Sequence, residues 1–262
     1  DPDKYQDNKI DVHKDDEVPS IAIIPLKNKG DDKDIYYAYG ISAELISDCI
    51  SAGLIRVASL KDIENLDYKT LDTSEIASKL FVRYIASGTL WKMDEIFQLS
   101  IELYDTIESK VLWSDIWAES WDNLPTIKEN IADGLLKALD ANTIIEKKVK
   151  TSNTEAYEYY LRAKYLYEKR ENMKDTEVAR GLLKKSIELD NNMLEAKNLY
   201  GVSHFEMSNY NEAMKIYMDN LKQAEQMDEK RGIGYSLRNI GAIHTLTGDL
   251  DISLYYLNRS LK

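Results

Sequence analysis

The first half of the chain alternates short apolar runs with stretches of helical periodicity. Residues 19–26 (PSIAIIPL) form a continuous apolar run, which is typical of a strand buried on both faces. Residues 97–103 alternate between apolar and polar side chains, which indicates a strand with one buried face. Further strands are predicted over residues 54–59, 82–92 and 110–121, and helices over residues 35–53, 72–80 and 124–140. The order βαβαβββα predicts a mixed sheet with its helices on one side.

The second half is helical in pattern from Ser152 onward, with apolar residues recurring at intervals of three and four. Residues 198–217 and 239–257 are near copies, in which Gly201 aligns with Gly241. One pair of helices cannot bury its apolar face alone, so the copies are expected to stack. In each pair we expect a small residue of the first helix to meet a small and then a larger residue of the second; the three sets are Ala163, Ala179 and Leu183, then Gly201, Ala213 and Tyr217, then Gly241, Ser253 and Leu257.

These spacings resemble tetratricopeptide (TPR) repeats, in three units over residues 153–262, and the unit at residues 194–221 matches best. In the first unit the stretch EKRENMKDTEV is expected to lengthen the turn between the two helices. The offset from Gly201 to Gly241 exceeds the usual period of about 34 residues, which predicts longer second helices. The resemblance implies an all-α solenoid whose groove holds an extended or helical peptide of a partner protein.

Four short motifs in the first half resemble the TolB N-terminal-like (FlgO-like) domain over residues 19–141. They are the strand end at residues 23–26, YYAYGI at 36–41, FVRYIASGTL at 81–90 and LWSDIWA at 112–118. Where that family has Asp, Glu and Arg, this chain has Tyr39, Ser87 and Ile116. The same domain followed by TPR units is typical of proteins that carry class III nucleotide cyclases, winged-helix regulators or protein kinases, which implies a signalling role.

The predicted organisation is an α/β domain followed by an all-α TPR solenoid. Its parts are a charged leader (residues 1–18), a TolB-like domain (19–141), a linker (142–150) and a TPR domain of about three repeats (151–262). The first residue is Asp1 and no signal-peptide pattern follows it, so we expect a piece of a longer signalling protein. The repeats end without a polar capping helix, and a homodimer through that end stays open.

Charge is unevenly divided between the halves and argues against nucleic acid as a partner. Residues 151–262 carry 16 of the 34 basic and 17 of the 46 acidic side chains, which leaves 18 and 29 for residues 1–150. Phosphate backbones need a basic face, which neither half provides. No apolar run approaches the roughly 20 residues of a membrane helix. We favour a cytoplasmic location, while a periplasmic location stays open if the protein has a membrane span elsewhere.

The sequence predicts no catalytic residue, no cofactor and no metal site. The stretch KNKGDDKD at residues 27–34 lacks the GK[ST] ending of a phosphate-binding loop and the spacing of a calcium loop, which favours a solvated turn. Cys49 lies in an apolar pattern and is expected to be a small buried hydrophobe. His204 and His244 are equivalent positions of two repeats, and packed, hydrogen-bonded histidines are favoured over ligands because no third ligand is in register.

Two functional interpretations follow from these patterns. The first is a non-catalytic interaction and sensing module, whose groove residues face a partner protein or peptide; they are Asn198, Val202, Phe205, Tyr235, Arg238 and Thr245. The second is an enzyme or small-molecule receptor in the α/β domain, with a pocket near the end of the first strand, around Tyr36, Tyr37, Tyr39 and Glu44. We favour the first interpretation, with dimerisation as a compatible addition.

Overall fold

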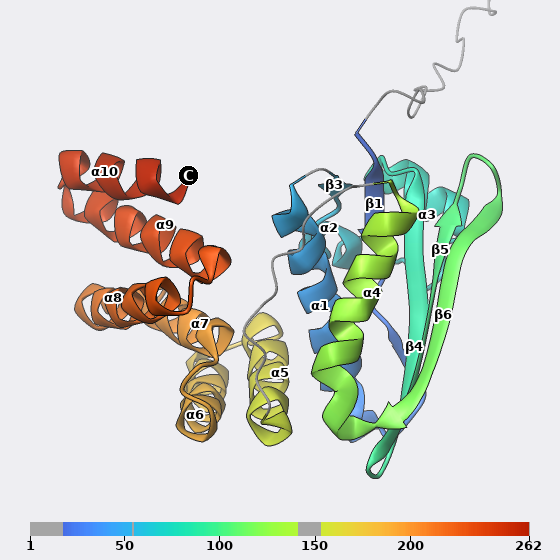
Figure 1. The fold of residues 1–262 in the computed structure, drawn as a ribbon, viewed down its shortest axis with the longest axis horizontal. Helices are drawn as coiled ribbons and strands as arrows, with labels where there is room; N and C mark the ends of the chain where they lie inside the picture. The colour runs from blue at the N-terminus through green and yellow to red at the C-terminus, as the bar shows by residue number, and fades with distance from the viewer. Residues whose placement is uncertain (1–17, 54, 141–152, 262) are drawn as a thin grey trace, which may run out of the picture.

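The computed structural model describes residues 18–53, 55–140 and 153–261, and it contains a mixed sheet followed by a stack of helices (Figure 1). The predicted leader and the predicted linker lie almost wholly outside the described residues. The sheet order is β3-β1-β4-β5-β6, with β2 also paired to β4. Its strands in chain order are β1 (Ser20–Ile23), β2 (Lys27–Asn28), β3 (Arg56–Val57), β4 (Tyr84–Met93), β5 (Ile96–Asp105) and β6 (Lys110–Ser120).

Strands β3, β1 and β4 lie side by side in parallel, and strands β4, β5 and β6 form an antiparallel meander. β1 pairs in parallel with both β3 and β4, whereas β4, β5 and β6 pair antiparallel in sequence order. The helices of this part are α1 (Ile35–Ala52), α2 (Leu60–Glu64), α3 (Thr73–Leu80) and α4 (Leu124–Ala138). The predicted α/β order is confirmed, with β2 and α2 as short additions.

The prediction that the helices lie on one side of the sheet is wrong for α3. Ala86 and Leu90 pair with Leu103 and Leu99 on β5, and this face is covered by α1 and α4. Ile85 must point to the opposite face because side chains alternate along a strand. It is nevertheless only 2% exposed, since α3 packs against β4 there, behind the strands in Figure 1. Crossovers that run in opposite directions along a sheet place their helices on opposite faces when both are right-handed.

Helix α1 is buried on nearly all sides because it lies between the sheet and the helical stack (Figure 1). It ends at Gly53, whose φ of 75° is the left-handed conformation that glycine adopts readily at a helix end. Cys49 on this helix is fully buried, as the apolar pattern predicts, and burial raises the pKa of its thiol to about 12. None of the helices in the described part of the chain is both long enough and apolar enough to cross a membrane.

The helical stack consists, in the described residues, of three successive pairs. Its helices are α5 (Thr154–Glu168), α6 (Met173–Leu189), α7 (Leu194–Phe205), α8 (Tyr210–Gln226), α9 (Lys230–Thr247) and α10 (Leu250–Ser260). The pairs are α5 with α6, α7 with α8 and α9 with α10, and each pair also contacts the next (Figure 1). The turn of the first pair (residues 169–172) is as long as that of the second (residues 206–209), so the predicted lengthening there is wrong.

The repeated glycines do bring paired helices into close contact. A Cβ atom on Gly201 would lie 2.4 Å from the ring of Tyr217, and one on Gly241 would lie 2.8 Å from Leu257. Ala163, Ala179 and Leu183 are fully buried at the corresponding place in the first pair. The spacing of small and large residues therefore predicts the packing within each pair correctly.

Hydrophobic packing divides the chain differently from the predicted domains. One cluster extends from the sheet through α1 and α4 into α5, α6 and the first turn of α7, and includes Leu161, Leu183 and Ala196. A second, smaller cluster lies among α7, α8, α9 and α10, around Tyr217 and Leu237. The first helical pair is therefore part of the same core as the sheet.

Candidate functional site at the junction of sheet domain and helical stack

The sheet domain and the helical stack meet through the packing of α1 against α5. A Cβ atom on Gly40 would lie 2.8 Å from Cδ2 of Leu161, so the two helices approach closely at this glycine. Tyr39, the residue before Gly40 on α1, packs edge-on against Tyr165 of α5, with ring centroids 5.2 Å apart. At the end of α5, Lys169 forms an ion pair with Glu64 on α2 at 2.6 Å. This contact joins two parts that are remote in sequence.

Two carboxylates on the same face of α1 organise a buried ionic cluster at this junction. Glu44 Oε1 accepts hydrogen bonds from the Tyr160 hydroxyl and from Lys164 Nζ, each at 2.6 Å. Lys128 Nζ on α4 lies 3.5 Å from Glu44 Oε2 and 2.9 Å from Asp48 Oδ2. Glu44 and Asp48 are four residues apart, which places them on one side of a helix.

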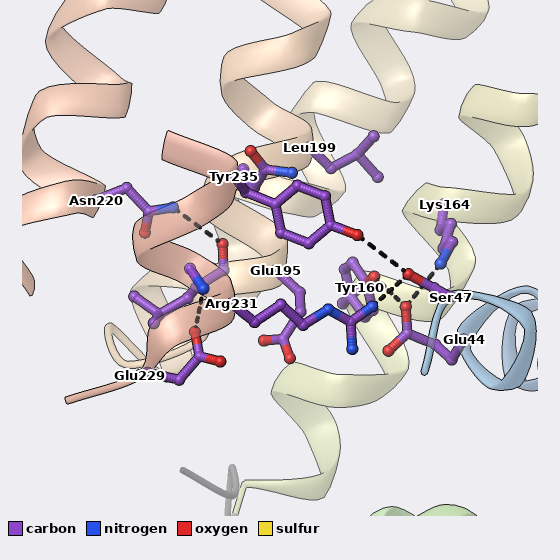
Figure 2. A pocket seen from close by; sticks show the side chains of 13 residues that line it. Glu44, Ser47, Tyr160, Lys164, Glu195, Leu199, Asn220, Glu229, Arg231 and Tyr235 are labelled. Carbon is purple, nitrogen blue, oxygen red and sulfur yellow. Dashed lines mark hydrogen bonds and ion pairs between the residues drawn. The ribbon is translucent and has the colours of Figure 1, made fainter. Parts of the chain in front are cut away.

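Helix α9 completes this cluster from the other end of the stack. The guanidinium group of Arg231 pairs with Asp48 and donates to the Ser47 hydroxyl, and Tyr235 lies 3.4 Å from that hydroxyl. Figure 2 shows Arg231 and Tyr235 extending toward α1 beside Tyr160 and Lys164. We call these side chains the junction network, which comprises Glu44, Ser47, Asp48, Lys128, Tyr160, Lys164, Arg231 and Tyr235.

The electrostatics of the junction network keep its cations charged. Burial alone would lower the pKa of Lys128, but the adjacent Asp48 and Glu44 outweigh this effect and raise it well above its usual value. Arg231 behaves likewise: Asp48 more than offsets burial, so its pKa is raised. Burial would raise the pKa of Tyr235, yet Arg231 and the hydrogen bond with Ser47 lower it below its usual value. Lys128 and Arg231 thus stay charged at neutral pH, each beside Asp48.

A cavity of about 150 Å³ opens beside the junction network (Figure 2), and we call it the junction pocket. Its walls come from α1, α5, α7, α8 and the first turn of α9; they include Glu44, Tyr160, Lys164, Glu195, Asn198, Leu199, Asn220, Glu229, Arg231 and Tyr235. Two buried polar atoms of these walls, Arg231 Nε and Asn220 Oδ1, have no hydrogen-bond partner among the described residues. Both atoms are shielded within the walls, so the open volume itself is bordered mainly by side chains that are already paired.

The structure brings only some of the predicted groove residues to this site. Asn198 and Tyr235 line the junction pocket, and Asn198 Oδ1 accepts a hydrogen bond from Asn239 at 3.0 Å. Val202 and Phe205 instead pack against the second hydrophobic cluster. Arg238 is exposed, with its guanidinium carbon 5.0 Å from the centre of the Tyr235 ring.

Thr245 lies further along α9 and takes part in the contact between α9 and α10. Its hydroxyl is 2.7 Å from that of Ser253, one of the predicted small contact residues. The six residues predicted for the groove are thus spread over the pocket, the core and the exposed surface of α9. Their proposed role in binding a partner stays a prediction.

The tyrosines predicted to line a ligand pocket near the end of the first strand instead pack against other side chains. Tyr37 lies edge-on to Trp121 with centroids 4.5 Å apart, and Tyr36 lies 5.9 Å from the guanidinium carbon of Arg162. Glu44 alone of that set lines the junction pocket. Tyr39 faces α5, whereas Ser87 and Ile116 lie on the sheet face opposite α1, so these three positions do not converge.

The two repeat histidines are packed side chains in the structure. His204 lies edge-on to Tyr200 with centroids 4.8 Å apart, and its ring nitrogens have no partner among the described residues. The predicted hydrogen bonding is therefore wrong for His204, whereas His244 Nδ1 lies 3.4 Å from Asp249. Within the described ranges, no three His, Cys, Asp or Glu side chains are grouped so that they could hold a metal ion.

The sequence analysis missed most of the junction network. Asp48, Lys128, Lys164 and Arg231 come from four helices and carry no motif. One signal was present: Glu44 and Asp48 interrupt a helix that is otherwise buried on nearly every side. Buried carboxylates need partners, so this pair could have indicated an interface with basic residues.

The site is thus an ionic junction between an α/β domain and a stack of helices. No protein-family model matches the chain. Among curated proteins it is 24% identical over 184 residues to "Putative adenylate cyclase 3" of Rhizobium meliloti (strain 1021), an alignment that covers 68% of this chain. The chain spans 31% of the length of that relative.

Similar solved structures include two proteins at low identity. TolB from Acinetobacter baumannii is 18% identical, with a TM-score of 0.36, and covers 47% of this chain and 29% of its own. The PelC dodecamer subunit from Paraburkholderia phytofirmans is also 18% identical, with a TM-score of 0.33, and covers 47% of this chain and 89% of its own. Scores below 0.5 do not establish a shared fold.

Proposed function

We propose that this chain is a non-catalytic interaction and sensing module of a larger signalling protein, in a region associated with a nucleotide cyclase. In this proposal the helical stack is a TPR solenoid, and the surface of α7 and α9 beyond the junction binds a partner protein or peptide. The observation that carries the proposal is the similarity to the curated protein named "Putative adenylate cyclase 3", together with its extent: the aligned part is a minority of that protein.

The use of the charged groups at the junction supports a role without catalysis. Glu44, Asp48 and Lys128 are all at least nine-tenths buried, and each is engaged in an ion pair that joins helices. Acid–base catalysts must instead reach a substrate proton at hydrogen-bond distance. The pairing of the first helical pair with the sheet also gives the later helices a rigid base from which to hold a partner.

Two measurements test this proposal. The purified chain, incubated with ATP or GTP and divalent cations, is expected to form no cyclic nucleotide, and cyclic product from this chain would overturn the non-catalytic assignment. A photo-reactive amino acid is then placed at Arg238, in cells that naturally make the protein, with the exposed Lys184 on α6 as the matched control. We expect a protein crosslink from position 238, and equal yields at the two positions would contradict the groove.

A homodimer is a second candidate because α10 exposes an apolar stripe. Leu250 and Leu254 are 65% and 60% exposed one turn apart, and Leu261 continues the stripe at 84%. In this proposal a second copy covers the stripe. Light scattering after size exclusion should give twice the chain mass, and Leu254→Asp should return the mass to that of one chain; a wild-type monomer at high concentration would contradict the dimer.

A further inference from the structure

Strand β6 forms the outer edge of the sheet, and one of its sides has no strand beside it in the described part of the chain. It is last in the sheet order, after β5, and no other element lies along its outer side in Figure 1. The backbone N–H of Ile116 donates to the carboxylate of Asp115 at 2.8 Å, so this amide is not spent on β5. Backbone groups of alternate residues point to the same side of a strand, so those of Ser114 and Ala118 are directed outward as well. Such an edge can accept a further strand.

One face of this edge carries two carboxylates and two indole rings. The residues concerned pair with the buried positions of β5, on the sheet face that α1 and α4 cover; they are Trp113, Asp115, Trp117 and Glu119. Asp115 and Glu119 are exposed, and neither takes part in an ion pair with another described residue. The two tryptophan rings lie 6.4 Å apart between centroids. Carboxylates attract the side chains of arginine and lysine, and an indole face binds the same cations.

The other face of the edge is apolar at its centre. Ile116 is 64% exposed and Ala118 is also exposed, on the sheet face opposite α1. Side chains alternate between the two faces of a strand, so one extended segment beside β6 meets both faces in turn. It fits best if basic side chains alternate with apolar ones. Strand β6 has 11 residues, which is long enough to pair with a segment of nine residues, about 30 Å in length.

Pairing of β6 with β6 of a second copy is unfavourable. Antiparallel pairing of the two edges would place Asp115 and Glu119 of both copies on one face of the joined sheet. Like charges on neighbouring strands destabilise a sheet. The chain as a whole also has a formal net charge of −12. A strand of opposite charge is therefore the occupant that this edge fits.

We propose that the outer edge of β6 binds an extended segment of a partner protein in which arginine or lysine alternates with apolar residues. The basic side chains lie beside Asp115 and Glu119 and over the two indole rings, and the apolar side chains lie beside Ile116. Backbone hydrogen bonds extend the sheet by one strand. In the complex Asp115 releases the Ile116 amide to the added strand and pairs with a basic side chain instead. This surface belongs to the sheet domain, so the inference does not depend on partner binding by α7 and α9.

Fluorescence anisotropy of a labelled peptide, titrated with the whole chain, tests the proposal. The probe is the synthetic peptide Thr-Arg-Val-Arg-Thr-Arg-Val-Arg-Thr, and the comparator has the same composition with its four arginines adjacent. We expect the probe to bind saturably and at least tenfold more tightly than the comparator. Absence of saturable binding overturns the proposal, as does equal binding by the comparator.

Two N-methylated versions of the probe test whether the peptide binds as a strand. One is methylated at the arginine amides and the other at the valine and internal threonine amides, so each lacks the donors along one edge. Only one edge of an added strand faces β6, so one version should bind at least tenfold more weakly than the other. Equal affinities of the two versions contradict strand addition.

Variants locate the binding at β6. Asp115→Asn combined with Glu119→Gln should weaken binding of the probe at least tenfold. Glu212→Gln combined with Asp219→Asn is the matched control, because it removes the same charge from exposed positions on α8. Unchanged affinity in the first variant, or an equal loss in the control, overturns the assignment. Failure of these tests leaves the proposed function intact, and failure of the crosslinking test at Arg238 leaves the β6 edge intact as a binding surface.

Discussion

Arg231 on α9 pairs with Asp48 on α1, although 183 residues separate them in the sequence. The Asp48 side chain is 8% exposed and that of Arg231 is 18% exposed, so water screens this pair only weakly. Hydrophobic packing connects α1 to α5, whereas α9 belongs to the second cluster. The ion pair is therefore a polar attachment between two separately packed parts.

Asp48→Asn should destabilise the chain by about 3 kcal/mol, because removal of one partner leaves a buried charge uncompensated. Urea unfolding of the wild type and the variant measures the difference. Glu225→Gln is the matched control: Glu225 pairs with Arg259 at 3.0 Å, but both side chains are more than a third exposed. Its loss should cost less than about 1 kcal/mol. Similar losses in the two variants would mean that the junction contributes no more than a surface pair.

Gly201→Ala should destabilise the helical stack by about 1–3 kcal/mol, because the added methyl group collides with the ring of Tyr217. Gly181→Ala on α6 is the control, since no atom lies within 4 Å of the Cβ position there. Alanine has the higher helix propensity, so that variant should be more stable than the wild type by up to about 1 kcal/mol. Thermal unfolding should show a lower melting temperature for Gly201→Ala and a higher one for Gly181→Ala. A change in the same direction in both variants would contradict the close contact.

Asp105→Asn should lower the free energy of unfolding at neutral pH, and this loss should be smaller at pH 3. Burial alone would raise the pKa of Asp105, but Arg83 and the backbone amides of Ile107 and Glu108 lower it below its usual value. A carboxylate with a lowered folded pKa contributes fully above the unfolded pKa of about 4, and its contribution disappears as the pH falls through the folded pKa. Urea unfolding at pH 6 and pH 3 should show the gap between wild type and variant shrinking. A constant gap would contradict this role.

Cys49 should react with thiol reagents only when the packing around α1 in the sheet domain opens. Its side chain is fully buried, and burial raises the thiol pKa to about 12, so little thiolate exists at pH 8. Ellman's reagent should label the native chain at least a hundredfold more slowly than the chain in urea. Because no other cysteine is present, the rate reports on α1 alone. Rapid labelling of the native chain would show that α1 is less tightly packed.

The local pattern of the sequence predicts most elements of the sheet domain because neighbours in the chain determine them. Alternation over residues 97–103 corresponds to β5, where Phe97, Leu99, Ile101 and Leu103 are buried. Asp72 and Glu75 form the predicted capping box of α3. The face on which α3 packs depends on strand order, which local pattern does not contain, and this explains the error for that helix.

The candidate site was far less predictable because its residues meet only through tertiary structure. Glu44 and Lys164 are 120 residues apart, and neither belongs to the repeat pattern. The repeats predicted the contact of Gly201 with Tyr217, since both occupy fixed places in a copied unit. They could not predict that Tyr235 meets Ser47, because the partner lies outside the repeats.

The shared core of α1 and α5 determines where the chain can be divided. A cut near residue 150 would uncover Leu161 on one fragment and the groove around Gly40 on the other, so both would aggregate or unfold. A cut after α7 would instead leave the buried residues of the first cluster on one fragment and those of the second cluster on the other. Helices from α8 onward could thus be shortened, lengthened or exchanged over evolutionary time while the sheet and helices α5 to α7 stay intact.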